Sequence, residues 1–331
     1  MAGRDHGGGI DAARARYGGS RAAWLDLSTG INPEPYPVTV APEAWTSLPD
    51  SGAMERLLGA ARAFWNVPED TAIVAGAGAS ALIAQIPFLA PAERVSIPAR
   101  TYNEHAASFR FAGWEIGENA PAAVIVHPNN PDGALYPAPN APFSVIDESF
   151  CDVLPEASHI AESARSGRIV LKSFGKFWGL AGLRLGFAIG DPALIEALAA
   201  RLGPWAVPGP ALEIGARALE DEAWAADTRI RLAEDAARLD ALLLGCGARA
   251  IGGTSLFRLY DVADAAAVQD ALAQHHVLTR VFPYSRTWLR LGMPPRGRWE
   301  QLVRALETAG GTAGGAIRAG TASRGSAVPS S

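Results

Sequence analysis

The chain has 331 residues, of which 49% are apolar and 19% are charged, and its net charge is −5. This composition indicates a globular protein large enough for two lobes and argues against a disordered chain. Because the charge is slightly negative and no basic block is present, neither nucleic acid nor an anionic membrane surface is an expected partner.

Cysteine usage and hydropathy limit the cellular setting. Cys151 and Cys246 lie far apart and share no metal-ligand spacing, so we expect no metal site and a reducing, cytoplasmic compartment. The N-terminus lacks the apolar segment of a signal peptide. Residues 71–92 are uncharged and long enough to cross a bilayer, but glycines, prolines and polar residues interrupt them. We interpret them as a strand, a loop and a buried helix.

The first part of the chain alternates between predicted strands and predicted helices. The strands are short apolar runs, at 71–75, 94–97, 114–117, 122–127, 143–147, 168–172 and 185–189. The helices are expected at about 79–89, 102–112, 157–166 and 192–202. Short apolar strands separated by helices predict a mostly parallel sheet that is buried on both faces.

The pattern changes after "GPWAVPGP" (203–210). Helical spacing over 210–244 is followed by predicted strands and helices that alternate less regularly. The strands are expected near 248–251, 254–260, 277–282 and 287–292, and the helices near 263–275 and 297–309. This order predicts a second, α+β lobe. The tail, 310–331, is rich in Gly, Ser and Ala and is predicted to be disordered.

A glycine-rich turn, "GAGAS" (76–80), follows the first strand of the predicted sheet and opens a helix. Ligands of open α/β sheets bind at the carboxyl ends of the strands, and a helix N-terminus offers free N–H groups to an anion. No Lys-Ser/Thr pair follows, and position 81 is Ala rather than Gly. The turn therefore fits neither a P-loop nor the nucleotide-binding motif of a Rossmann-type dehydrogenase.

Three further polar groups follow successive strands. The motif "HPNNPDG" follows strand 122–127, Asp147 ends strand 143–147, and Lys176 follows strand 168–172. Each alone could be a plain turn, a structural ion pair or a solvated loop residue. Together with the glycine-rich turn they supply what a pyridinium cofactor needs: a phosphate cradle, a donor to the ring oxygen, a partner for the ring nitrogen and a nucleophilic amine.

The motifs "SFGKFWGLAGLRLGF", "VIDESF" and "HPNNPDG" resemble those of the fold-type I pyridoxal-phosphate enzymes, in the branch of histidinol-phosphate aminotransferase. The resemblance covers roughly residues 5–308. It implies the α/β fold of fold-type I transferases, with a large domain built on a mostly parallel seven-stranded sheet, a smaller α+β domain, and a homodimer with active sites at its interface. The implied division is an N-terminal segment 1–40 that joins the small domain, a large domain 41–205, a small domain 206–309 and the tail 310–331.

The resemblance also assigns roles around pyridoxal 5'-phosphate. Lys176 would bind the cofactor covalently and move protons, Asp147 would pair with the pyridine nitrogen, and Asn130 would donate to the phenolic oxygen. Tyr102 would stack on the ring, and Arg290 would bind the substrate carboxylate through its bidentate guanidinium. The residues implied to hold the cofactor phosphate are Gly78, Ala79, Ser80, Ser173 and Arg184.

Within that branch, "DHGGGIDAARARYGG" and "DLSTGINPEPYP" resemble the start of the L-threonine-O-3-phosphate decarboxylases of cobalamin biosynthesis. His6 and Asn32 match substrate-facing positions of that group, and Arg280 would suit a substrate phosphate. Leu48 stands where aminotransferases usually have a tyrosine that reaches the neighbouring subunit's cofactor phosphate. The implied reaction is decarboxylation of a phosphorylated amino acid, and a histidinol-phosphate or other amino-acid aminotransferase remains the alternative.

Two departures from the family pattern leave a non-catalytic scaffold as a further alternative. Phe150 stands where many relatives have a tyrosine that donates to the ring oxygen. The absence of that hydroxyl implies a raised pKa for the lysine-bound cofactor. Residues 134–143 contain three prolines where relatives have a crossover helix, so an extended segment or a partner should cover the sheet there. The retained charged residues disfavour the scaffold, because a non-catalytic chain has no use for them.

Overall fold

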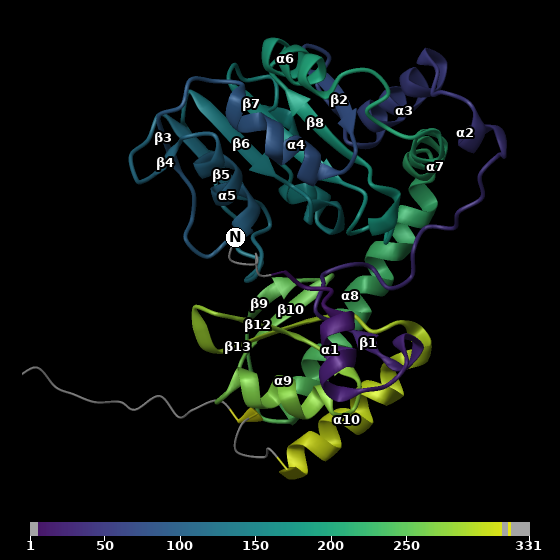
Figure 1. The fold of residues 1–331 in the computed structure, drawn as a ribbon, viewed down its shortest axis with the longest axis vertical. Coiled ribbons are helices and arrows are strands. Elements are labelled where there is room, and N and C mark those ends of the chain that lie inside the picture. Colours follow the sequence, from purple (N-terminus) through teal and green to yellow (C-terminus); the bar gives the residue numbers. More distant parts are fainter. Residues whose placement is uncertain (1–5, 313–316, 319–331) are drawn as a thin grey trace, which may run out of the picture.

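The computed structural model describes residues 6–312 and 317–318, which form two bodies side by side (Figure 1). The larger body contains a seven-stranded sheet, and the smaller one contains a four-stranded antiparallel sheet together with the N-terminal segment. Of the predicted tail, helix α10 (Trp299–Thr312) includes the first residues, and Ile317 is buried in the core. The other tail residues lie outside the described part of the chain.

The large sheet has the strand order β2-β8-β7-β6-β5-β3-β4. Its strands are β2 (Ala72–Gly76), β3 (Arg94–Ser96), β4 (Glu115–Ile116), β5 (Ala122–Val126), β6 (Phe143–Asp147), β7 (Arg168–Ser173) and β8 (Gly186–Gly190). Only β8 runs antiparallel to its neighbours. Every residue of β6, β7 and β8 is buried. The prediction of a mostly parallel sheet buried on both faces is therefore confirmed.

Helices cover both faces of the large sheet. One face packs against α4 (Ala79–Gln85), α5 (Asn103–Phe111) and α6 (Pro192–Leu202), through a core that contains Leu82, Phe109 and Leu198. Helices α3 (Ser51–Phe64) and α7 (Gly209–Leu219) pack against each other in the second core, on the other face. A short helix, α2 (Glu43–Thr46), contacts α7.

Two crossovers of the sheet depart from regular helical connections. Residues 134–140 form neither helix nor strand, as the prolines predict, and Tyr136 and Ala138 of this segment pack on the core. The predicted helix at 157–166 is wrong, because residues 155–162 form only short 3₁₀ turns. The side chain of Ser158 and the backbone N–H of His159 bind the carboxylate of Glu148, and this use of local groups breaks the regular helical pattern.

The predicted helical region 210–244 is two helices. Helix α7 ends before Glu220, and α8 (Glu222–Gly245) begins after Asp221, whose carboxylate accepts from the N–H of Trp224. Helix α7 packs beside α3 in the large body, whereas α8 runs down to the small sheet (Figure 1). The domain boundary proposed at residue 206 thus precedes a helix that packs with the large body.

The small sheet has the order β12-β13-β10-β9, and all its pairs are antiparallel. Its strands are β9 (Arg249–Thr254), β10 (Phe257–Asp261), β12 (Arg280–Phe282) and β13 (Ser285–Gly292). The predicted single strand at 277–282 is two strands, since β11 (Val277–Leu278) instead pairs in parallel with β1 (Leu25–Asp26) of the N-terminal segment. Helices α1 (Ile10–Tyr17), α9 (Ala265–Ala273) and α10 complete this body.

Strand direction brings the polar motifs together. The parallel strands β2, β5, β6 and β7 all end at one edge of the large sheet, and the antiparallel β8 begins there. Arg184, just before β8, therefore joins the residues that follow the parallel strands. The small body lies against this edge (Figure 1). In the described ranges no helix is both long and apolar enough to cross a membrane.

Candidate active site

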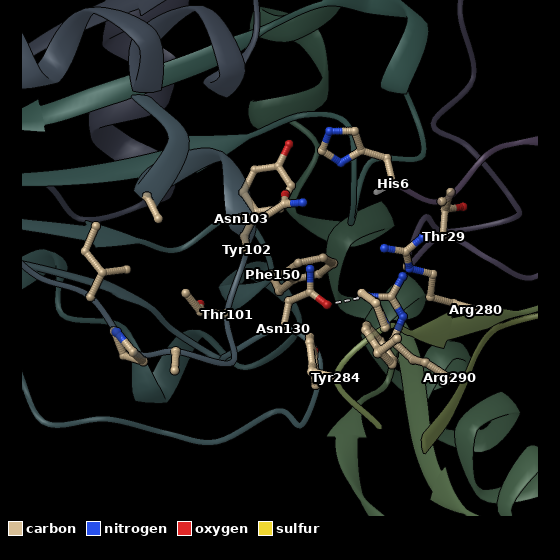
Figure 2. Close-up of a pocket in the computed structure, with 18 of the residues that line it drawn as sticks. His6, Thr29, Thr101, Tyr102, Asn103, Asn130, Phe150, Arg280, Tyr284 and Arg290 are labelled. Atoms are coloured by element: carbon tan, nitrogen blue, oxygen red, sulfur yellow. Dashed lines mark hydrogen bonds between the residues drawn. The ribbon is translucent and has the colours of Figure 1, made fainter. Parts of the chain in front are cut away.

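Two adjoining cavities lie at this edge of the large sheet. The larger has a volume of about 610 Å³ and is lined from both bodies, and the smaller measures about 100 Å³ and lies over the strand ends. The side chains that line both cavities are Tyr102, Asn130, Phe150 and Lys176. Figure 2 shows that residues of the large body and the arginines of the small body approach the larger cavity from opposite sides. The arrangement provides a deep subsite and an outer subsite.

Asp147 lies at the floor of the smaller cavity and is buried. One carboxylate oxygen is 2.8 Å from Nε2 of His105, and the other accepts from the backbone N–H of Ser149 at 2.9 Å and from its hydroxyl at 2.5 Å. Burial alone would raise the pKa of Asp147, but the hydrogen bond and charge of His105 and the bonds from Ser149 hold it below its usual value. The group is therefore an anion that can pair with a cationic ring nitrogen.

His105 is a site residue that sequence reasoning missed. It is buried on α5 and lies three residues after Tyr102, whose ring it meets edge-on at a centroid distance of 6.1 Å. Residues three apart on a helix share one face, so the segment "PARTYNEHA" carried a usable signal once Tyr102 had been singled out. His105 orients the carboxylate of Asp147 from behind.

The charges of two arginines and one aspartate act on the buried amine of Lys176. Burial, together with the charges of Arg290 and Arg184, lowers the pKa of its amine to about 8, although the charge of Asp147 opposes them. Its Nζ lies 5.3 Å from the centroid of the Phe150 ring. A substantial fraction of this amine is neutral near pH 8, which is the nucleophilic form that condenses with an aldehyde.

A close approach between α4 and Arg184 forms an anion cradle. Gly78 has φ +84°, and a Cβ there would lie 2.6 Å from Nη2 of Arg184. A Cβ at Gly186 would lie 2.4 Å from the backbone nitrogen of Ala79. Arg184 is itself left-handed (φ +54°), and its Nη1 donates to the carbonyl of Ala181 at 3.0 Å. The two glycines thus let the Arg184 guanidinium and the start of β8 approach the N-terminus of α4 closely.

The remaining predicted phosphate-binding residues and Tyr102 border the same space. Ser80 and Ser173 line the smaller cavity beside Arg184. Burial, followed by the charges of Glu104 and Asp147, raises the pKa of Tyr102, so its hydroxyl stays protonated. A phosphate bound here would meet backbone N–H groups, hydroxyls and a guanidinium, which is the donor set that such an anion requires.

Arg290 is buried at the boundary between the two bodies. Its Nη1 donates to Oδ1 of Asn130, and its Nη2 donates to the carbonyl of Ser28 at 2.8 Å. Its buried Nε has no hydrogen-bond partner among the described residues. Burial lowers its pKa to about 10, and the charge of Arg280 contributes. Because the amide oxygen of Asn130 accepts from Arg290, the amide NH₂ is the group left to donate to a cofactor.

The predicted outer residues differ in where they lie. Arg280 faces Arg290 across the β12–β13 pair and lines the larger cavity. His6 lines it too, with Nε2 3.0 Å from Oε1 of Glu104 (Figure 2). Asn32 is not among the lining residues. Its side chain donates to the carbonyl of Phe177 at 2.8 Å, and its backbone N–H donates to the carbonyl of Lys176 at 3.0 Å. Asn32 thus supports the lysine loop from behind, and its contact with substrate stays a prediction.

Glu148, next to Asp147, belongs to a different cluster. Its carboxylate is 2.6 Å from Nζ of the buried Lys172 and accepts from Ser158 at 2.6 Å. Asp152 lies 3.7 Å from the same Nζ. Successive residues of a strand point to opposite faces, so this cluster is on the side away from the two cavities. Among the described residues, no three His, Cys, Asp or Glu side chains are arranged to hold a metal ion.

The matched family model, aminotransferase class I and II, spans residues 116–308 of this chain. The chain belongs to the aminotransferase class I and II family. That family assignment agrees with the fold, with the lysine between cations and with the buried aspartate, and the fold-type I prediction is confirmed.

Two relatives of this aminotransferase-family chain are named threonine-phosphate decarboxylase. One, from Sinorhizobium sp., is 41% identical over 313 residues, which are 88% of this chain and 93% of the relative. The other, from Pseudomonas aeruginosa, is 39% identical over 326 residues, which are 91% of this chain and 97% of the relative.

Solved structures of the same family share the fold at low identity. A histidinol-phosphate aminotransferase from Sinorhizobium meliloti in complex with pyridoxal-5'-phosphate has a TM-score of 0.77 and 18% identity, and covers 90% of this chain and 93% of its own. An L-threonine-O-3-phosphate decarboxylase from Porphyromonas gingivalis has a TM-score of 0.68 and 18% identity, and covers 85% and 98%.

The residues of this family member fit pyridoxal phosphate. The glycine-shaped cradle beside Arg184 suits the phosphate, the anionic Asp147 suits the ring nitrogen, and the low-pKa amine of Lys176 suits the aldehyde. The family is pyridoxal-phosphate dependent, so the cofactor is pyridoxal 5'-phosphate and the protein is an enzyme of this class.

Proposed function

We propose that this protein decarboxylates L-threonine O-3-phosphate to (R)-1-aminopropan-2-yl phosphate, a step of cobalamin biosynthesis. The observation that carries the proposal is the outer cavity, where the paired arginines Arg280 and Arg290 and the N-terminal His6 face Lys176. Two cations suit a substrate with a carboxylate and a phosphate. The names of the two relatives that align over most of the chain support the same substrate.

Pyridoxal phosphate, when bound, withdraws electrons from the substrate Cα. The residues of this chain bind and orient the reactants and move a proton. Asp147, held anionic by His105 and Ser149, keeps the ring nitrogen protonated. The amide of Asn130, whose oxygen is held by Arg290, donates to the ring oxygen. Phe150 contributes only an apolar ring there, so Asn130 is the main donor.

Orientation of the substrate selects decarboxylation over transamination. The bond that breaks must stand perpendicular to the cofactor ring, so the protein has to place the Cα–carboxylate bond, rather than the Cα–H bond, in that direction. Arg290 would hold the carboxylate, and Arg280 with His6 would hold the phosphate, with Asn32 as a further predicted contact. The electrons of the broken bond remain with the substrate as CO₂ leaves, and the protonated form of Lys176 would return a proton to Cα.

We further propose that the protein is a homodimer. Val38, Trp45 and Leu48 lie on or beside α2 and are 56%, 72% and 69% exposed. Leu48 lines a groove of about 320 Å³ between α2 and α7. Exposed large apolar side chains beside a groove are typical of an association surface. The molar mass in solution tests this proposal, and Trp45→Glu should weaken the dimer.

We also propose a cytoplasmic location. Both cysteines are unpaired, and burial raises the pKa of the Cys151 thiol, which suits a reduced protein.

The decisive experiment is release of CO₂ from L-threonine O-phosphate by the pyridoxal-phosphate-loaded protein, with Lys176→Ala as the control. We expect stoichiometric CO₂ and aminopropanol phosphate without a keto acid. Amine transfer to a keto acid without CO₂ would identify an aminotransferase instead. Loss of both activities, in a protein that binds the cofactor, would show that the substrate assignment is wrong.

A further inference from the structure

Contacts between the two bodies gather on one side of the small sheet. Nη1 of Arg290 on β13 donates to Asn130, and the Phe257 ring on β10 meets Phe150 edge-on at a centroid distance of 5.0 Å. Each of these contacts pairs a residue of the small body with a residue of the cofactor site. The relative placement of the bodies therefore decides where the substrate-binding arginines lie.

A further contact crosses the boundary farther from the cofactor site. The guanidinium carbon of Arg100, in the loop that follows β3, lies 5.0 Å from the centroid of the Trp288 ring on β13. Trp288 is partly buried and also meets the rings of Phe282 and Tyr284 edge-on, at 6.5 and 6.0 Å. Phe282 and Tyr284 line the larger cavity. The pair thus joins the rim of that cavity to the large body.

The backbone that carries Arg100 is fixed by the motif "HPNNPDG". The fully buried Asn129 donates to the carbonyl of Arg100 at 3.0 Å and accepts from the hydroxyl of Thr101 at 2.7 Å. Its amide also donates to Oδ1 of Asp132 at 2.9 Å. The two adjacent asparagines therefore both stabilise the contact between the large and small bodies. Asn130 contacts Arg290 directly, and Asn129 fixes the loop whose Arg100 contacts Trp288.

Trp288 and Arg290 lie two residues apart on one strand, so their side chains are on the same face, about 7 Å apart along it. We propose that Arg100 and Trp288 are positioning residues for the reaction. Their contact across the two bodies sets Arg290 and Arg280 at the distance from Lys176 that substrate binding requires. The inference deepens the proposed function, because it rests on those arginines binding the substrate.

A guanidinium over an indole at a partly exposed site changes an equilibrium constant by about three- to tenfold. We therefore expect Arg100→Ala and Trp288→Ala each to raise the KM for L-threonine O-phosphate by about that factor, with little change in kcat. Arg100→Lys keeps the charge over the ring, and Trp288→Phe keeps an aromatic face, so both should restore part of the affinity. A general packing defect would not show this rescue.

The double variant Arg100→Ala with Trp288→Ala measures whether the two residues act through each other. If they do, its KM equals that of either single variant within about twofold. Arg201→Ala is the matched control, because its guanidinium lies 4.8 Å from the Phe88 ring, away from the boundary. This control should leave KM unchanged. Multiplicative effects of the two single variants, or an unchanged KM for Arg100→Ala, would overturn the proposal.

A second measurement does not depend on turnover. Hydrogen exchange of the cofactor-free protein should show faster exchange across β12 and β13 in Arg100→Ala, with exchange in β6 and β7 unchanged. Calorimetry with L-threonine O-phosphate should show the same loss of affinity. If the wild type binds this ligand but releases no CO₂, and Arg100→Ala still exchanges faster than the wild type, the proposed reaction is wrong and the positioning contact is supported. If the wild type and the variant exchange equally, the positioning contact is wrong and the proposed reaction is unaffected.

Discussion

Lys172 and Lys176 lie four residues apart, at the two sides of the same large sheet, and their chemistry is opposite. Lys172 is buried against two carboxylates, with Glu148 at 2.6 Å and Asp152 at 3.7 Å, and its pKa is raised although burial alone would lower it. The pKa of Lys176, by contrast, is lowered to about 8 by burial and by the charges of two arginines.

The difference teaches that burial alone does not create a reactive lysine. Desolvation lowers the pKa of both amines, and the charges of the neighbours decide the outcome. Two anions keep Lys172 a permanent cation in a structural cluster. Two cations, opposed by Asp147 alone, leave Lys176 available as a neutral nucleophile.

The largest expected effect is that of Lys176→Ala. Removing the amine removes both the covalent attachment of the cofactor and the proton donor, so kcat should fall by roughly four orders of magnitude or more. The absorbance of the lysine-bound cofactor should disappear, while the unfolding midpoint of the cofactor-free protein changes little. Retention of that absorbance band would assign the attachment to another lysine.

Lys172→Met should act on stability and spare the chemistry. The change leaves Glu148 and Asp152 buried without their cation, which costs about 3–5 kcal/mol in the free energy of unfolding. Denaturant titration measures this loss. The triple change Lys172→Met, Glu148→Gln and Asp152→Asn is the matched control, because it removes the uncompensated charges as well. It should regain part of the stability, and equal loss in both proteins would contradict the charge argument.

The adjacent carboxylates Asp147 and Glu148 allow a parallel comparison at lower amplitude. Asp147→Asn removes the anion from the cofactor site, and kcat should fall about 100-fold, as for other electrostatic groups that stabilise a transition state. Glu148→Gln should leave the kcat of the folded enzyme within about threefold and reduce stability. Both variants have the same charge change, so steady-state kinetics together with thermal unfolding separate the two roles.

The smallest expected effect is a shift on the pH axis. The neutral amine of Lys176 is the reacting form, so the rate of pyridoxal-phosphate attachment to the cofactor-free protein should rise with pH, with a midpoint near 8. Arg290→Gln removes a cation and should move the midpoint to higher pH. Asp147→Asn removes the opposing anion and should move it to lower pH. Stopped-flow absorbance measures both shifts, and shifts of the same sign would refute the electrostatic account.

Local patterns and the family motifs predicted which residues lie together around the smaller cavity. The residues that follow β2, β5, β6 and β7 were assigned from short apolar runs and from contiguous motifs, and the strand directions bring them to one edge. Arg184 belongs with them because β8 runs antiparallel. His105 was missed because its spacing from Tyr102 places it near the site but does not distinguish a histidine that holds a carboxylate from an ordinary buried one.

The helix predicted at 157–166 failed for a long-range reason. The carboxylate of Glu148 accepts hydrogen bonds from the hydroxyl of Ser158 and the N–H of His159. The same carboxylate forms an ion pair with the buried Lys172. Local propensity contains no information on a carboxylate that arrives from a neighbouring strand.

The amino-acid sequence by itself determined most of the order of strands and helices and the family motifs, because these depend on short-range periodicity and on adjacent residues. Tertiary structure alone decided the pKa of Lys176, the support of Asn130 by Arg290 and the contact of Arg100 with Trp288. Each of these depends on the distance between groups that the chain brings together from remote positions, and electrostatic and packing energies fall off with that distance rather than with separation along the chain.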